Sequence, residues 1–221
     1  MLAILAVGVA GAATHWPTDL QWTTIRAMLG SQSAPLELAF RYQKGDGVAQ
    51  NDERAFHWFW VAARRGDARA QNELGTMYEN GRGVSQDFTL AAAWYGMAAS
   101  QGLAQAQHDL GLLYQTGRGV HRDDARAVRW YRKAAEQGHL GAQNNLGVMY
   151  QQGRGVEKDD AQAAYWYGKA AAQGHAWAQT NLGYLYEHGR GVEKDPEVAA
   201  LWYRKAAKQG HEGARRRLEQ Q

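Results

Sequence analysis

A spacing of 36 residues recurs along almost the whole chain and restricts the possible folds more than any other feature. An aromatic pair, an Ala-Ala pair, a single glycine, a Leu-Gly pair and a Gly-x-Gly-Val motif each return at this interval. The Gly-x-Gly-Val copies begin at Gly45, Gly81, Gly117, Gly153 and Gly189. Independent patterns that share one period without an insertion predict a repeat protein, in which each unit stacks on the next.

Each unit is predicted to form two helices joined by a loop. In residues 67–102 the apolar side chains of the first half follow helical spacing, i, i+4, i+7 and i+8. These side chains are Ala70, Leu74, Met77 and Tyr78. Gly81 is expected to end this helix, because glycine readily adopts the positive φ of a helix terminus. Polar residues at a shared position are expected to cap the second helix, and they are Asn51, Asp87, Asp123, Asp159 and Asp195.

The predicted fold is therefore all-α, a right-handed α-α superhelix, or solenoid, of five 36-residue helix-turn-helix repeats with a C-terminal capping helix. The repeats are expected at 34–66, 67–102, 103–138, 139–174 and 175–210, and the capping half-repeat at 211–221. Each tryptophan of the aromatic pair is expected to be buried beside the next unit. The Leu-Gly glycines are expected to let helix backbones approach closely. Residues 14–33 are expected to hold an N-terminal capping helix that turns Leu20, Ile25, Met28 and Leu29 inward.

Charge and cysteine content argue against several functions. The net charge is +3 and basic residues alternate with acidic ones, so nucleic acid is not expected as a partner. The run Arg215-Arg216-Arg217 is too short for a polyanion site and is interpreted as a solvated helix end. The chain has no cysteine, so it has no disulfide, no thiolate nucleophile and no cysteine-based metal site.

Residues 1–13 form an apolar run, and no charged side chain occurs in residues 1–18. The run is too short to span a bilayer, which needs about 20 residues. It resembles the apolar part of a secretory signal cleaved near Thr14, although no Lys or Arg precedes it. We therefore expect a periplasmic or secreted protein. The alternatives are a start that omits the basic part of a signal, an apolar first helix of a cytoplasmic protein, and membrane association through an uncleaved anchor.

Three groups of residues suggest chemistry, and each has a structural explanation. His139, His175 and His211 share one repeat position, but neighbouring helices lie roughly 8–10 Å apart, too far to share one ion. The Gly-Arg-Gly-Val loops follow a helix rather than a strand and lack the Gly-Lys-Ser/Thr of a phosphate-binding loop. Asp123-Asp124 and Asp159-Asp160 fall at helix starts, where negative charge is favourable. We expect no metal, no cofactor and no catalytic residue.

The repeat resembles the Sel-one-like repeat (SLR) family, a relative of the tetratricopeptide repeats. The consensus AQxxLGxMYxxGRGVxxDxxxAxxWYxxAAxQG appears almost whole in residues 139–174, as AQNNLGVMYQQGRGVEKDDAQAAYWYGKAAAQG. The resemblance covers about residues 34–218, and the first unit departs from it at Ala39 and Asp46. It implies an adaptor or scaffold that binds a protein or peptide on its concave face. A cysteine-rich bacterial subgroup is linked to β-lactam binding, and the lack of cysteine removes the reason to expect that activity here.

A partner is expected along the first helices of the units, at positions 69, 73, 76 and 80 and their copies, because these positions vary while the core positions repeat. Trp177 and Tyr184 are the clearest candidates, since they share one helix face and aromatic side chains often anchor interfaces. The alternative for Trp177 is that it folds over a neighbouring helix or the terminal cap. The candidate residues are Glu73, Thr76, Leu112, Asn145, Val148, Gln152, Trp177, Asn181, Tyr184 and His188.

The predicted function is a protein–protein interaction scaffold or adaptor of bacterial type. Two alternatives stay open, an immunity-type inhibitor of a secreted toxin and an enzyme that acts on cell-wall material. Turnover of a reactive substrate would favour the enzyme. Salt-dependent retention on DNA or RNA would favour a nucleic-acid binder.

Overall fold

The computed structural model describes residues 18–219, which form helices and loops and contain no strand. Residues 1–13, expected to be a secretory signal, lie outside the described residues, as do 14–17, 220 and 221. Within residues 18–219, none of the helices combines the length and the hydropathy that a bilayer-spanning segment requires. The helices are α1 (Asp19–Met28), α2 (Ala34–Lys44), α3 (Asp52–Arg64), α4 (Ala68–Asn80), α5 (Phe88–Ser100), α6 (Ala104–Thr116), α7 (Asp124–Glu136), α8 (Leu140–Gln152), α9 (Asp160–Ala172), α10 (Ala176–His188), α11 (Pro196–Lys208) and α12 (Glu212–Glu219).

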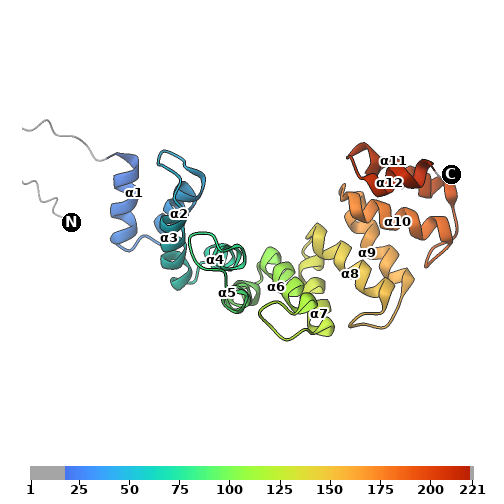
Figure 1. Cartoon of the computed structure of the whole chain (residues 1–221), viewed down its shortest axis with the longest axis horizontal. Helices are drawn as coiled ribbons and strands as arrows, with labels where there is room; N and C mark the ends of the chain where they lie inside the picture. Colours follow the sequence, from blue (N-terminus) through green and yellow to red (C-terminus); the bar gives the residue numbers. More distant parts are fainter. Residues whose placement is uncertain (1–17, 220–221) are drawn as a thin grey trace, which may run out of the picture.

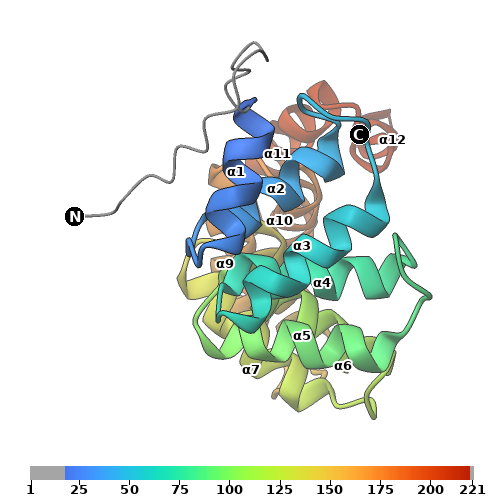
Figure 2. The ribbon, with the colours of Figure 1, turned by 90° about the vertical axis from the view of Figure 1, so that its left-hand side faces the viewer.

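The helices stack in pairs into a curved solenoid (Figure 1). The pairs from α2–α3 to α10–α11 are the five units, with α1 before them and α12 after them. The arc opens upward in Figure 1, where α4, α6 and α8 lie on its inner side and α5 and α7 on its outer side. Figure 2, viewed from the α1 end, shows the helices winding around a common axis. We call α2, α4, α6, α8, α10 and α12 the inner row, and the other helices the outer row. The predicted all-α solenoid is confirmed.

The helix ends follow the repeat as the sequence predicted. Asn51 and the four equivalent aspartates accept hydrogen bonds from backbone amides at the starts of α3, α5, α7, α9 and α11. Each inner helix from α2 to α10 ends at a glycine in the left-handed conformation, which glycine adopts without steric penalty. The predicted N-caps and C-caps are therefore confirmed.

The core of each unit is built on the tyrosine of the aromatic pair rather than on the tryptophan. In units two to five the fully buried aromatic residues are Tyr95, Tyr131, Tyr167 and Tyr203. The expectation of buried tryptophans was wrong except for Trp166, which is 8% exposed. Trp94 lies at the edge of the cluster formed by α2, α3 and α4, so its indole covers the core of the preceding unit instead of entering the next one.

The glycine of each Leu-Gly pair makes room for that tyrosine. A Cβ atom on Gly75 would lie 2.5 Å from Tyr95 Cδ1, and the next three units repeat this conflict at 2.6 to 2.8 Å. These glycines were expected to bring helix backbones together, but they accept an aromatic ring of the same unit. The close contact explains why a residue without a side chain returns at this position.

From unit two onward, the Gly-Arg-Gly-Val loop joins each unit to the one before it. A Cβ atom on Gly83, the second glycine, would lie 2.3 Å from the Asp52 carbonyl oxygen. The neighbouring Arg82 pairs with the carboxylate of the same Asp52 at 2.8 Å. The equivalent ion pairs are Arg154–Asp124 and Arg190–Asp160. The motif therefore serves contact between units.

The first helix packs through different side chains from those predicted. Of the four apolar residues expected to face inward, Leu20 is partly buried, whereas Ile25, Met28 and Leu29 are 36%, 74% and 81% exposed. The inward orientation of these three was wrong. The buried residues of α1 are Thr23 and Ala27. Since α1 packs mainly against α2, the side chains on its other faces stay in solvent.

The helix α1 is the outer helix of an incomplete additional unit. Trp22 lies 36 residues before Trp58, and Gly30 lies 36 residues before Gly66. Gly30 and Gly66 also share one backbone conformation, with φ of 92° and 90°. The sequence analysis missed this register because, apart from Ala27, which lies 36 residues before Ala63, the other motif residues are absent from residues 18–30.

Candidate protein-binding surface

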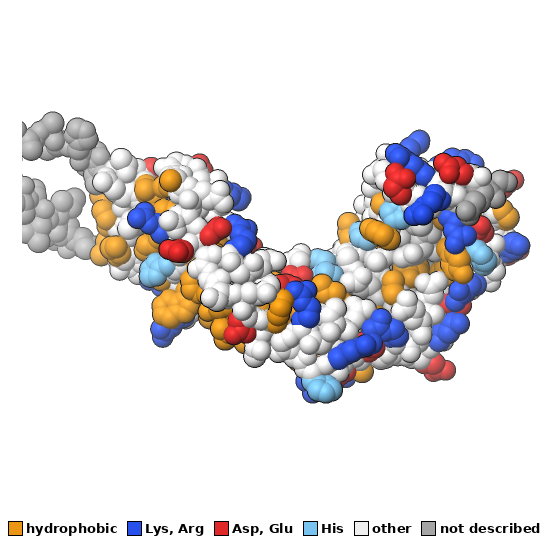
Figure 3. Space-filling view, viewed as in Figure 1, with side chains coloured by type: hydrophobic (Ala, Val, Ile, Leu, Met, Phe, Trp, Pro, Cys, Tyr) orange, Lys and Arg blue, Asp and Glu red, His pale blue; other side chains and the backbone are white. Residues whose placement is uncertain are grey.

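The candidate residues lie on a stripe along the solvent side of the inner row. From α4 to α10, the residues at positions 69, 73, 76 and 80 and their copies are half-buried or exposed, while those at 70, 74 and 77 are buried. Figure 3 shows the hollow between the two arms of the arc, on the side of the inner row. Because every unit presents the same helix face, the stripe continues from unit to unit.

Two of the candidate amides lie at junctions between units. Asn145 on α8 and His108 Nε2 on α6 are 3.2 Å apart in a hydrogen bond, with the amide as donor. Asn181 on α10 donates to Asn144 Oδ1 on α8 at 3.1 Å. Neighbouring inner helices therefore meet through side chains along the stripe, and these asparagines help to join them.

Trp177 stands in the first turn of α10 and is 64% exposed. Its ring meets the edge of His211, with ring centroids 4.4 Å apart. The contact with the terminal cap that the sequence left open is thus present, and most of the indole still faces solvent. An indole oriented by a neighbour offers a partner a large apolar surface with little side-chain entropy left to lose.

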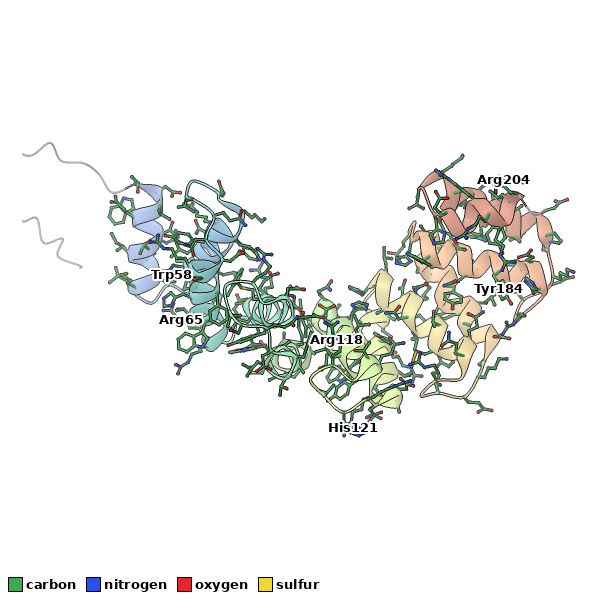
Figure 4. The ribbon with its side chains drawn as sticks, viewed as in Figure 1. Trp58, Arg65, Arg118, His121, Tyr184 and Arg204 are labelled. Atoms are coloured by element: carbon green, nitrogen blue, oxygen red, sulfur yellow. The ribbon has the colours of Figure 1, made fainter. Side chains whose placement is uncertain are left out.

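Tyr184 lies farther along α10, inside a ring of cationic and imidazole side chains. His188 lies against it with ring centroids 4.2 Å apart, and the guanidinium carbons of Arg190 and Arg217 are 5.7 and 5.5 Å from the ring centroid. Cations over an aromatic face are attracted by its quadrupole, so the two arginines help to fix the ring. Figure 4 labels Tyr184 on the C-terminal arm. We call Trp177, Tyr184, His188, His211 and Arg217 the aromatic cluster.

The middle of the stripe is less polar in α6 and α8. Leu112 and Val148 are half-buried, and Gln152 is exposed at the end of α8. Val148 also packs against the core formed by α9 and α10. Leu112 and Val148 therefore offer only part of their apolar surface to a partner, and Val148 supports the fold as well.

Glu73 and Thr76 on α4 are not brought to the aromatic cluster, because α6 and α8 lie between. Both have partners of their own. The Thr76 hydroxyl bonds to the Asn72 carbonyl oxygen at 3.2 Å and lies 3.1 Å from the Tyr95 hydroxyl. Glu73 accepts a hydrogen bond from Gln43 at 3.1 Å. Thr76 thus has a role inside its unit.

A histidine pair at the α6–α8 junction was missed by the sequence analysis. The rings of His108 and His139 stack with centroids 4.6 Å apart. His108 Nδ1 lies 2.9 Å from Asp109, and His139 Nε2 lies 3.0 Å from Gln105. Burial, and then the nearby His108, lower the pKa of His139. The two histidines are 31 residues apart, so a search at a 36-residue period does not connect them.

The groups that first suggested chemistry have structural roles. Nδ1 of His139, His175 and His211 each accepts a hydrogen bond from the backbone amide three residues later. The hydrogen bond from Arg154 lowers the pKa of the Asp124 carboxyl. Within residues 18–219, no three potential ligands among His, Cys, Asp and Glu come together around one point.

Open cavities recur between the end of an inner helix and the start of its outer partner. In unit three a cavity of about 410 Å³ is lined by Tyr114, Val120, His121, Asp123 and Arg126. Equivalent positions line cavities of about 460 Å³ in unit one and about 620 Å³ in unit five. A cavity that returns with the repeat follows from the fold, so it does not single out a ligand site.

Sequence comparison identifies the repeat. The Sel1 repeat model matches residues 34–67, 68–103, 104–139, 141–175 and 178–211. A comparison with curated proteins gives no match.

Solved structures share this fold at substantial identity. The protective antigen c5321 of uropathogenic Escherichia coli, which displays an SLR fold, is 42% identical with a TM-score of 0.88. That match covers 91% of this chain and 43% of the antigen, so this chain spans less than half of the antigen's length. A Sel1 repeat protein of Oxalobacter formigenes is 36% identical, with a TM-score of 0.80, over 86% of this chain and 79% of that one. The immunity protein Pa5087 of Pseudomonas aeruginosa is 25% identical, with a TM-score of 0.53, over 84% of this chain and 68% of that one.

Proposed function

This chain belongs to the Sel1 repeat family, and from that membership we propose that it is a scaffold or adaptor that binds a protein or peptide along its inner row, with Trp177 and Tyr184 as the main contacts. Sel1 repeat proteins are generally non-catalytic protein-interaction scaffolds. The observation that carries the proposal is the 64% exposed indole of Trp177 at a position that the core does not use. The corresponding residues of units two to four are Arg69, Gln105 and Gly141, so the fold does not require an aromatic side chain there.

The arrangement of the two aromatic residues supports one continuous contact surface. Trp177 and Tyr184 are two turns apart on the same side of α10, and each is oriented by neighbouring rings. Asn181 lies between them on the same face. Large aromatic side chains flanked by hydrogen-bonding groups are the usual composition of interface centres.

Variants at the two aromatic positions test this proposal. The double variant Trp177→Ala/Tyr184→Ala is compared with wild type in capture of proteins from native extract, and the captured protein is then purified and its affinity measured. We expect the double variant to lose at least tenfold in affinity, about 1.4 kcal/mol. The matched control is Tyr165→Ala/Leu201→Ala, which removes two exposed apolar side chains from the outer row. Unchanged affinity in the double variant, with helicity intact, would reject the proposal.

An inhibitor of the immunity type is the second candidate. The observation that favours it is the likeness to the immunity protein Pa5087 over most of both chains. Such a protein would abolish the activity of one toxin at a one-to-one ratio, whereas an adaptor would leave the activity of its partner unchanged. Activity of the captured protein, measured with and without this chain, separates the two roles.

We also propose that the protein is exported, on the basis of the apolar segment 1–13. N-terminal sequencing of the mature protein tests this. A first residue near Thr14 is expected, and an intact N-terminus in the cytoplasm would reject export.

A further inference from the structure

One position of the inner row changes its charge steadily from one end of the solenoid to the other. The position is that of Glu73, and it is occupied at every 36th residue by Glu37, Glu73, Asp109, Asn145, Asn181 and Arg217. These residues come in order from α2, α4, α6, α8, α10 and α12, and all six are half-buried. The series runs from three acids through two amides to one base. Asn145 and Asn181 also join neighbouring inner helices, but the buried core of the repeat places no constraint on charge at the other four positions.

The acidic end holds two carboxylates, Glu73 and Asp109, that make no ion pair with a lysine or arginine in the described residues. Glu37 pairs with Arg41 at 2.9 Å, but Glu73 makes no ion pair within the described residues and accepts only from the neutral amide of Gln43. Asp109 contacts His108 Nδ1 at 2.9 Å, and its charge also acts on the nearby His139, so its neighbours of possible positive charge are imidazoles. The carboxylates of Glu73 and Asp109, on neighbouring helices α4 and α6, thus make no ion pair with a lysine or arginine in residues 18–219, although the charge of Glu73 also acts on Arg82.

A buried acceptor adjoins these carboxylates. Asn72, next to Glu73, is 7% exposed, and its Oδ1 atom has no hydrogen-bond partner within residues 18–219. The residues at the same position in the next two units, His108 and Asn144, bond across to the following inner helix. Asn72 Oδ1 is itself shielded from solvent, so it is an unsatisfied acceptor beside Glu73 and not a contact for a bound partner.

The opposite end is basic and aromatic. Arg217 on α12 lies over the Tyr184 ring, and its side chain is 40% exposed. Within residues 18–219 its ion-pair partner is Glu187, at 3.7 Å. Glu187 is already engaged by the Tyr203 hydroxyl at 2.7 Å. The adjacent Arg216 is exposed and makes no ion pair within the described residues. This end therefore offers guanidinium groups to a carboxylate.

We propose that the inner row binds a polypeptide segment with the opposite order of charge, so that its basic residues lie beside Glu73 and Asp109 and its acidic residues lie beside Arg217 and the aromatic cluster. The inference rests on the proposed function and adds the orientation and composition of the bound segment. A nucleic acid fits this surface poorly, because its phosphates would have to pass the unpaired carboxylates of α4 and α6. Three helix layers separate Asp109 from Arg217, roughly 30 Å at about 10 Å per layer, which corresponds to about nine extended residues.

Two synthetic peptides of about twelve residues test the orientation. One carries a lysine block, a neutral middle and a glutamate block, and the other has the same residues in reverse order. Each is made with a nitroxide at its lysine end or at its glutamate end, and broadening of the indole NMR signal of Trp177 is measured. The signal is identified as the one that the variant Trp177→Phe lacks, since the chain contains nine tryptophans. We expect the nitroxide at the glutamate end to broaden this signal in both peptides, and the nitroxide at the lysine end to leave it sharp.

A charge swap supplies the matched variant. Glu73→Arg/Arg217→Glu keeps the net charge and is expected to abolish the preference for the glutamate end. The control swap Glu136→Lys/Lys169→Glu on the outer row, where both residues are exposed, is expected to retain it. If the charge-swap variant fails to fold, the neutral variants Glu73→Gln and Arg217→Gln take its place and are expected to weaken the preference.

Three results would overturn the inference: equal broadening from both ends, broadening that follows chain direction rather than charge, and absence of binding by either peptide. None of these three results would contradict the proposed function. That proposal is tested separately, by the affinity of the captured partner for the Trp177→Ala/Tyr184→Ala variant. If the peptides show no preferred orientation but the Trp177→Ala/Tyr184→Ala variant still binds the captured partner more weakly, the protein would be a scaffold that does not orient its partner by charge.

Discussion

Alanine at Gly119 is expected to destabilise the protein more than alanine at Gly138, and the difference measures the packing between units. Both glycines have positive φ, 70° and 89°, so each alanine carries a backbone penalty of about 1–2 kcal/mol. A Cβ on Gly138 would meet nothing within 4 Å, whereas a Cβ on Gly119 would lie 2.0 Å from the Phe88 carbonyl oxygen at the start of α5. That oxygen belongs to the backbone of the preceding unit, so the steric clash can be relieved only if the two units move apart. This adds about 1–3 kcal/mol to the loss of unfolding free energy.

Urea unfolding of both variants, followed by circular dichroism, gives the two free energies. We expect a loss of about 1–2 kcal/mol for Gly138→Ala and of about 2–5 kcal/mol for Gly119→Ala. Hydrogen exchange should locate the extra loss in α5 to α7, on either side of the altered contact. Equal losses in the two variants would refute the idea that the second glycine of the motif holds neighbouring units together.

Three further predictions test other parts of the fold. Asp123→Ala removes the N-cap of α7 and should lower the free energy of unfolding by about 0.5–2 kcal/mol, and a thermal melt identical to wild type would contradict the cap. Tyr131→Ala should lower the free energy of unfolding by about 3–5 kcal/mol. This loss should exceed that of Trp130→Ala, because the tyrosine is fully buried and the tryptophan is not. Urea melts that rank the two variants in the opposite order would disprove this. Arg154→Ala should cost less than about 1 kcal/mol at neutral pH. Since Arg154 lowers the pKa of Asp124 in the folded state, the pair stabilises above the unfolded pKa of about 3.9. The difference from wild type should therefore vanish as pH falls through the lowered pKa of folded Asp124, and a difference that persists in acid would count against the ion pair.

Helix ends and the fold class could be predicted because they depend on residues that return with the period. Asp87 and Gly81 act on the backbone within a few residues of themselves, so each copy of the motif carries its own evidence. The exposed stripe could be predicted for the same reason, since positions that do not repeat are positions that the core does not use. Trp177 is exposed there as expected.

Contacts between units could not be predicted from the period. Arg154 meets a residue 30 positions earlier and Asn181 one 37 positions earlier, and these offsets are set by the angle between stacked helices. The charge gradient was overlooked for a related reason. The run of three arginines favours a solvated helix end, but its last member, Arg217, stands 36 residues after Asn181 and continues the inner row. In α1, Ile25 was expected inside because it is apolar, but the helix has too few neighbours to bury that face.

The most direct test of the central claim is a map of the NMR chemical shifts that change when the captured partner, once purified, binds to the isotope-labelled chain. If the inner row holds the partner, the largest changes fall on the indole of Trp177 and on the side-chain amides of Asn145 and Asn181, while outer-row residues such as Tyr165 keep their positions. Changes confined to the outer row, with the Trp177 signal unmoved, would contradict the account.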